Sequence, residues 1–295
     1  MRHSFLVLVA TALPTCVGAV PVPPAIAAMI DAAATDPATL KAVADVAKKT
    51  NPDSASEIDA QVAGIGASAE AARVEKLSSE TFLQGWKGSG EIGIDSSTGN
   101  TKEAGIAVGI TLNKESLHWR HALNGIVDYR RTNNVTSKDR YFGGYEGNYK
   151  ITPRFFALAV LSYDQDRFAG YNRRFAEGLG LGYSIIDTPT VKLNLEAGPA
   201  LRQTKYITGV TEDKLAGRVA GKFAWTITPT AVFSESASAY LVSGSTSFDS
   251  VTAITGKLAG ALSARASLTV HDETQAPLGR KPLDTTSRLT LEYGF

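Results

Sequence analysis

The chain of 295 residues has little cysteine, almost no net charge and no long apolar run beyond its beginning. Its one cysteine, Cys16, lies in the N-terminal leader, so the rest of the chain can form no disulfide or thiolate site. A formal net charge of +1 gives no support for nucleic-acid binding. No candidate membrane-spanning helix follows the leader, but a barrel strand needs only about 9–11 residues with every second one apolar. The composition therefore leaves a membrane β-barrel open.

Residues 1–19 predict a secretory signal peptide. Arg2 and His3 form a short basic region, residues 5–13 are apolar, and residues 17–19 offer a small-residue cleavage site. We therefore expect the mature chain to begin at Val20.

Residues 20–85 are rich in alanine and predict a short helical region. Asp36 followed by Pro37 is a favourable helix start, and Ser54 with Glu57 forms a capping-box pattern. The apolar stripe of these helices is narrow. It favours a small periplasmic hairpin or linker, with a plug of the barrel lumen or an oligomerisation helix as the alternatives.

From residue 86 to residue 295 the apolar residues recur with period two, which is typical of strands. At roughly 17 residues per strand and turn, this region predicts about 12 strands, an even number as bacterial barrels require. The faces of residues 154–167 and 230–243 cannot be assigned from the pattern. A soluble two-sheet sandwich is the alternative, but charges lie in mid-strand on the polar face and aromatics gather near strand ends. The predicted fold is all-β, a single-chain antiparallel transmembrane β-barrel preceded by the helical region.

The end of the chain shows the clearest alternation. Leu289, Leu291, Tyr293 and Phe295 share one face. An apolar face that ends on a phenylalanine resembles the sorting signal of outer-membrane barrels. We therefore expect outer-membrane lipid, the barrel assembly machinery and periplasmic chaperones as partners, and no nucleic acid.

Several motifs of residues 85–295 resemble the family of salt-induced outer-membrane proteins, a domain of unknown function (number 481). They are residues 86–93, 97–101, 149–151, 163–168, 170–172, 178–183, 284–286 and 289–295. The resemblance implies an outer-membrane barrel of a Gram-negative bacterium that is associated with salt or acid stress. It implies no catalytic residues.

The polar strand faces predict a charged lumen in which cations outnumber acids. The candidate lumen-lining residues are Arg120, Arg130, Arg140, Glu146, Lys150, Lys192, Glu196, Arg202, Arg218, Lys222, Arg265, Arg288 and Glu292. A filled lumen should approach neutrality, because unpaired buried charge is costly. The excess therefore favours a narrow channel for small anionic solutes over a closed structural barrel without transport.

Enzymatic chemistry is not expected. His118 and His121 are three residues apart, so on a strand they face opposite sides, with His118 toward the lumen and His121 toward lipid. Two ligands on opposite faces cannot share a metal ion, and no serine stands at a matching offset. We predict no enzyme, no cofactor and no metal, with a lipid-modifying enzyme as the weakest alternative.

Two further features favour structural roles. The cluster of Asp164, Asp166, Arg167, Arg173 and Arg174 is interpreted as salt bridges rather than an ion-binding site. The glycines of residues 178–182 recur with period two and no helix follows them, so they do not form a phosphate loop. We expect them on the inner face, where they leave room for large side chains of neighbouring strands.

Overall fold

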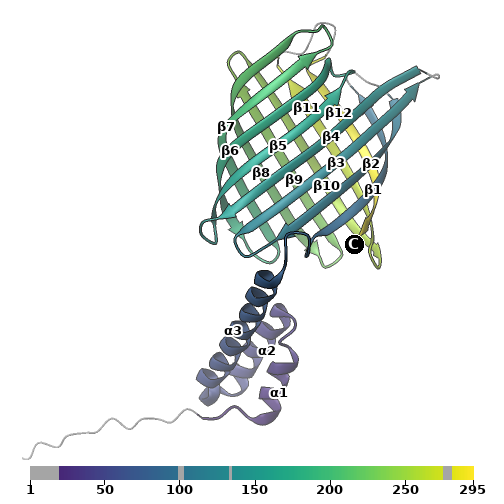
Figure 1. The fold of residues 1–295 in the computed structure, drawn as a ribbon. Coiled ribbons are helices and arrows are strands. Elements are labelled where there is room, and N and C mark those ends of the chain that lie inside the picture. The colour runs from purple at the N-terminus through teal and green to yellow at the C-terminus, as the bar shows by residue number, and fades with distance from the viewer. Residues whose placement is uncertain (1–19, 99–102, 133–134, 275–280) are drawn as a thin grey trace, which may run out of the picture. The chain divides into compact units, whose positions relative to one another are not determined.

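A computed structural model describes residues 20–98, 103–132, 135–274 and 281–295 (Figure 1). The predicted signal peptide, residues 1–19, lies outside the described residues. The chain divides into two compact units, one ending at Ser79 and the other beginning at Glu80. The division falls somewhat earlier than the predicted boundary at residue 85.

The first unit consists of short helices around a small core. They are α1 (Pro24–Ala32), α2 (Pro37–Thr50), the 3-10 turn η1 (Pro52–Ser54) and α3 (Ala55–Ser79). Ile30 and Ile58 are completely buried, and Leu40 and Ala44 pack in the same cluster. Alanine supplies much of this core, so little apolar area is buried. None of the described helices is both long enough and apolar enough to cross a membrane.

One of the two predicted helix starts is confirmed. The Asp36 carboxylate accepts hydrogen bonds from the backbone N–H groups of Ala38 and Thr39 at the beginning of α2. The hydrogen bond from the Thr39 hydroxyl, with that from Ala38, holds the pKa of Asp36 below its usual value. The predicted capping box differs, because Ser54 is buried in η1 and donates its hydroxyl to the Pro21 carbonyl at 3.2 Å.

The second unit is a closed barrel of twelve antiparallel strands, which confirms the predicted fold. The strands are β1 (Lys87–Thr98), β2 (Glu103–Glu115), β3 (Trp119–Thr132), β4 (Val135–Lys150), β5 (Phe155–Asp166), β6 (Tyr171–Asp187), β7 (Val191–Tyr206), β8 (Thr211–Thr228), β9 (Ala231–Val242), β10 (Ser245–Ala259), β11 (Leu262–Glu273) and β12 (Leu283–Gly294). Each strand pairs with its sequence neighbours, and β1 pairs with β12 to close the sheet (Figure 1). Closure leaves no strand edge unpaired.

The barrel has two distinct ends. We call the end where β1 begins and β12 ends the base. The opposite end, which carries the turns at residues 167–170, 207–210 and 243–244, is called the rim. An even number of strands brings the first and last strand termini to the same end.

The outer face of the barrel is apolar and exposed. Leu179 and Leu215 are 67% and 74% exposed, and the side chains of Ile94, Leu181 and Leu289 are also exposed. A soluble protein rarely exposes such a continuous apolar surface. The outward row suits the hydrocarbon of a bilayer, as the period-two pattern predicted.

The surroundings of β5 explain why the faces of residues 154–167 could not be assigned from the sequence. Its inner residues Phe156, Leu158 and Val160 are buried in the lumen, while Leu161 and Tyr163 on the outer face are exposed. Both faces are therefore apolar, and alternation disappears.

In β9 the opposite occurs, with polar residues on both faces. Ser236 pairs in register with the inward Lys222, so it faces the lumen. Glu235 faces outward, where its carboxylate accepts a hydrogen bond from the Ser250 hydroxyl at 2.6 Å. The sequence pattern did not show which residues of β9 face outward, because neither face of this strand is apolar throughout.

Inward glycines make room for large neighbours, as predicted. A Cβ at Gly182 would lie 2.2 Å from the Phe156 ring, and one at Gly105 would lie 2.1 Å from the Arg130 side chain. The steric interpretation of the glycine-rich strand is confirmed.

The segment before β1 lies against the outer wall of the barrel. Lys114, on the same face of β2 as Ile110, donates hydrogen bonds to the carbonyls of Thr81, at 2.6 Å, and Gln84. The rings of Phe82 and Trp86 lie 5.8 and 6.2 Å from the ring of His121, which belongs to the outer face of β3. These contacts explain why residues 80–86 belong to the barrel unit.

Candidate functional site: the charged lumen

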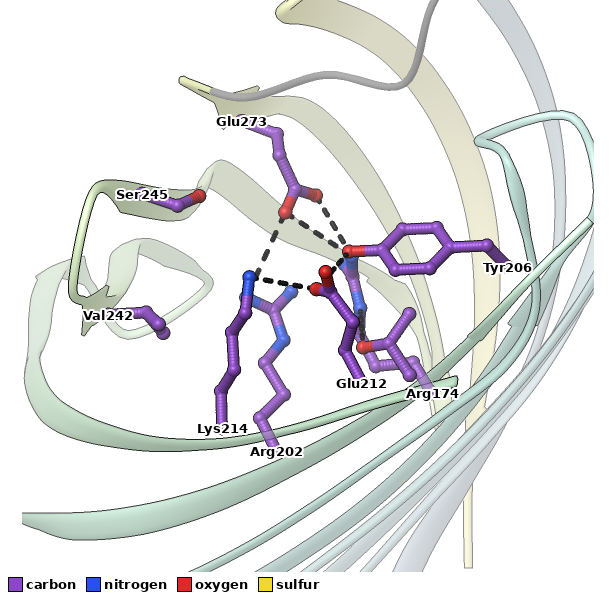
Figure 2. A pocket seen from close by; sticks show the side chains of 9 residues that line it. Arg174, Arg202, Tyr206, Glu212, Lys214, Val242, Ser245 and Glu273 are labelled. Atoms are coloured by element: carbon purple, nitrogen blue, oxygen red, sulfur yellow. Dashed lines mark hydrogen bonds and ion pairs between the residues drawn. The ribbon is translucent and has the colours of Figure 1, made fainter. Parts of the chain in front are cut away.

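Near the rim, ion pairs cross the lumen between strands that are not neighbours. Arg174 of β6 places Nη2 3.1 Å from Oε2 of Glu273 on β11. Arg202 of β7 places Nη1 4.0 Å from the other oxygen of Glu273 and 2.6 Å from the hydroxyl of Ser247 on β10. Figure 2 shows the arginines and Glu273 converging from opposite walls. One carboxylate therefore joins two distant parts of the wall.

These side chains fill most of the space between them. The pocket of Figure 2 is lined by Arg174, Arg202, Thr204, Tyr206, Glu212, Lys214, Val242, Ser245 and Glu273, and its cavity is about 20 Å³. Such a volume holds about one water molecule. Lys214 lies 2.8 Å from Glu212, so a second ion pair stands beside the first. Two ion pairs therefore lie side by side in this pocket near the rim.

The acidic residues at the end of β5 form salt bridges and a turn, as the structural interpretation expected. Arg140 donates two hydrogen bonds to Asp164, at 3.0 and 2.8 Å, and the Tyr171 hydroxyl donates a third at 3.1 Å. The Asp166 carboxylate accepts from the N–H groups of Phe168 and Ala169, at 3.0 and 2.9 Å. These groups hold the turn between β5 and β6.

A second set of ion pairs crosses the lumen nearer the base. Lys222 of β8 donates to both carboxylate oxygens of Glu146 on β4. Lys222 also lies 3.1 Å from Glu196, which Arg218 contacts at 3.0 Å. Because β4 and β8 are separated by three strands, this network too spans the lumen.

Further pairs join the remaining wall. Arg288 of β12 donates to Asp128 of β3, and Asp128 is almost completely buried. Arg265 of β11 lies 3.3 Å from Glu292 of β12. Arg130 is buried beside Gly105.

A cavity of about 220 Å³ lies at the base of the barrel. Its lining is Glu115, Arg120, Lys150, Thr152, Pro153, Ser184, Asp187, Lys192 and Asn194. Lys150 binds Glu115 at 2.5 Å, and Lys192 lies 3.8 Å from Asp187. We call this space the basal cavity.

A family model described as a protein of unknown function, DUF481, matches residues 90–295. The chain belongs to the DUF481 family. This confirms the family resemblance of the sequence motifs.

The relatives of this DUF481 protein give no activity. It is 25% identical over 143 residues to the "Uncharacterized protein YdiY" of Escherichia coli (strain K12), a match that covers 48% of this chain and only 57% of the relative. Among solved structures, it is similar to a NanC porin, with 10% identity, a TM-score of 0.49, and coverage of 69% of this chain and 98% of that one. It is also similar to the translocator domain of the autotransporter NalP from Neisseria meningitidis, with 15% identity, a TM-score of 0.44, and coverage of 78% and 96%.

In the DUF481 barrel, the candidate lumen residues fall into three groups. Arg140 and Arg202 take part in the pairs near the rim, and Arg120, Lys150 and Lys192 line the basal cavity. The other ion pairs described above contain Glu146, Glu196, Arg218, Lys222, Arg265, Arg288 and Glu292, while Arg130 is buried beside Gly105 near the rim end of β3. Sequence reasoning missed Glu273, the carboxylate that joins Arg174 and Arg202. The sequence could have placed Glu273 in the lumen, because Glu273 shares a strand face with Arg265 and His271.

His118 and His121 do not lie on opposite faces of β3 as predicted. The prediction that His118 points to the lumen is wrong, since β3 begins only at Trp119 and the His118 ring lies 6.4 Å from the outward Tyr149. His121 faces outward, where Nδ1 lies 2.9 Å from the Tyr145 hydroxyl. Across the described residues, no group of three His, Cys, Asp or Glu side chains could hold a metal ion.

Proposed function

We propose that this DUF481 protein is an outer-membrane barrel of a Gram-negative bacterium that conducts small solutes through a narrow charged lumen. The observation that carries the proposal is the bridging of non-neighbouring strands by Arg174 with Glu273 and by Lys222 with Glu146. Charged groups that converge across a pore create a constriction that selects by size and charge. The exposed apolar outer face supports the membrane location.

The proposed preference is for small anions, and it is modest. Many lumen cations are paired, since Arg140, Arg218 and Arg288 each contact a carboxylate. Acids such as Asp128 and Glu273 reduce the excess that the candidate residues alone suggested. Arg120 differs from these cations, because in the described part of the chain it contacts the Phe156 ring and forms no ion pair with an acid.

Single-channel recording of the refolded full-length chain in a salt gradient tests the function. We expect discrete conductance steps with a reversal potential biased toward anions. A second chain without residues 20–79 keeps the barrel unit and its contacts to Thr81 and Gln84. A larger conductance in that chain would identify the helical unit as a plug. Silence of both chains, with the barrel intact by circular dichroism, contradicts the proposal.

The second candidate is a closed structural barrel without transport. Its support is that ion pairs cross the lumen at two levels and leave a cavity of about 20 Å³ near the rim. It predicts that the protein stays silent even when a crossing pair is removed.

An association with salt or acid stress is the remaining part of the proposal, supported by the family resemblance. A strain without the protein should grow more slowly than its parent in high salt or at low pH, and normally in standard medium. Equal growth of the two strains under both stresses would remove this association.

We also propose that Leu289, Leu291, Tyr293 and Phe295 form the assembly signal. Their side chains are exposed on the outer face of β12, and Phe295 is 66% exposed. The backbone of Phe295 is already paired with that of Gly88, at 2.8 and 3.0 Å. The ring is therefore free for the assembly machinery to bind.

Phe295→Ala should slow assembly in the cell at least about tenfold, because burying a phenylalanine side chain contributes roughly 1.5–3 kcal/mol. The backbone pairing with Gly88 remains, so refolding in detergent should be nearly unaffected. The measurement is the fraction of barrel with folded gel mobility after pulse labelling. Leu215→Ala removes an equally exposed apolar side chain of β8 and serves as the control. Assembly of Phe295→Ala at the control rate would exclude this role.

A further inference from the structure

The basal cavity holds a cation without an acidic partner. Within the described parts of the chain, no carboxylate forms an ion pair with Arg120, and its buried Nε has no hydrogen-bond partner. Glu115 lies opposite Arg120 in the β2–β3 register, but its carboxylate binds Lys150 at 2.5 Å. A partly buried cation without a partner is costly, and an anion that reaches it relieves that cost.

Phe156 holds the Arg120 guanidinium in place. Cζ of Arg120 lies over the Phe156 ring, 4.7 Å from its centre, so the two groups form a cation–π contact. Phe156 is buried and packs against Gly182, where a Cβ would lie 2.2 Å from the ring. A guanidinium whose face is stacked keeps the N–H groups of its edge for hydrogen bonds. Those donors match the two oxygens of a carboxylate or phosphate.

The other walls of the basal cavity suit the same ligand. Lys150 and Lys192 add positive charge, which Glu115 and Asp187 offset, and Asn194 and Ser184 add neutral polar groups. With Arg120, the cations of the lining still outnumber its acids. A volume of about 220 Å³ admits a small organic anion as well as an inorganic one. Lys192 is exposed at the mouth, where it can attract an anion before Arg120 binds it.

We infer that the basal cavity binds a small oxyanion, a carboxylate or a phosphate, with Arg120 as its main ligand. The inference names the solute class of the proposed channel and rests on the proposed function for its role. Binding itself does not require conduction. A closed barrel could hold the anion as a fixed ligand, so binding and conductance are measured separately.

Isothermal titration calorimetry of the refolded full-length protein tests the inference, with inorganic phosphate and acetate as probes. We expect the wild type to bind at least one of them, and Arg120→Gln to bind it at least about tenfold more weakly, since hydrogen bonds to charged groups are strong. Lys257→Gln is the matched control. Lys257 is an exposed residue of β10 that does not line the basal cavity, and its replacement removes the same charge.

Arg120→Lys tests whether binding needs the paired N–H donors of the guanidinium or only its positive charge. It keeps the charge but loses the planar edge and the stacking on Phe156, so we expect intermediate affinity. If Arg120→Gln fails to refold, Arg120→Lys takes its place in the test. An anion affinity of Arg120→Lys below that of Lys257→Gln then supports the inference. Equal affinity of the Arg120 variants and the wild type, or no binding of either probe by the wild type, overturns it. Anion binding without conductance would overturn the proposed channel function and leave the inferred anion site supported.

Discussion

Gly198→Ala is expected to prevent the barrel from refolding. A Cβ at residue 198 would lie 2.0 Å from the carbonyl oxygen of Leu179 and 2.5 Å from Cα of Gly180. Both atoms belong to the backbone of β6, so no side-chain rotation can relieve the overlap. The strands β6 and β7 would have to separate at this point. We expect a loss of more than about 4 kcal/mol, which is exceptional for a single substitution.

The matched control is Gly143→Ala in β4. No atom lies within 4 Å of a Cβ built at Gly143. We expect its effect to stay within about 0.5 kcal/mol, as for surface substitutions in general. The measurement is urea unfolding in detergent, with the heat-dependent gel shift as the sign of a folded barrel. If both variants unfold at the wild-type midpoint, the claim that the β6 backbone leaves no room for a Cβ at residue 198 is wrong.

Glu273→Gln should produce the largest functional change. The side chains of Arg174 and Arg202 are only 9% and 11% exposed, and both contact Glu273. The amide keeps the shape of the side chain but removes the negative charge, so two nearly buried guanidinium groups repel each other without compensation. Breaking a buried pair costs about 3–5 kcal/mol. The arginines should move apart toward water, which widens the rim end of the lumen.

Single-channel recording then shows a higher conductance and a reversal potential shifted further toward anions. Glu212→Gln is the control within the same pocket, because Glu212 pairs with Lys214 while both are more than a third exposed. Exposed pairs contribute only about 0–1 kcal/mol, so this variant should conduct as the wild type does. A Glu273→Gln barrel with wild-type conductance would show that the crossing pair does not limit the pore. Silence of wild type and variant would favour the closed barrel.

The outward and inward positions of most strands could be predicted from the sequence. Residues 288–295 show why, because Leu289 and Tyr293 alternate with polar neighbours and lie on the outer face of β12. The prediction failed for β5, where Phe156 is buried in the lumen and Leu161 is exposed outside. A period-two pattern reports a face only when the two faces meet different surroundings.

The sequence by itself determined the strand period and the apolar outer face, because these follow from alternation along the chain, and the length of the alternating region gave the number of strands. Only the tertiary structure decided which lumen charges meet. Arg174 and Glu273 are separated by 99 residues, and among the residues that the structure describes no acid pairs with Arg120, although Glu115 stands opposite it in register. Contacts across the lumen depend on the tilt and stagger of the strands on closure. A local pattern assigns a face to each side chain, but the closed barrel sets its height and its partner.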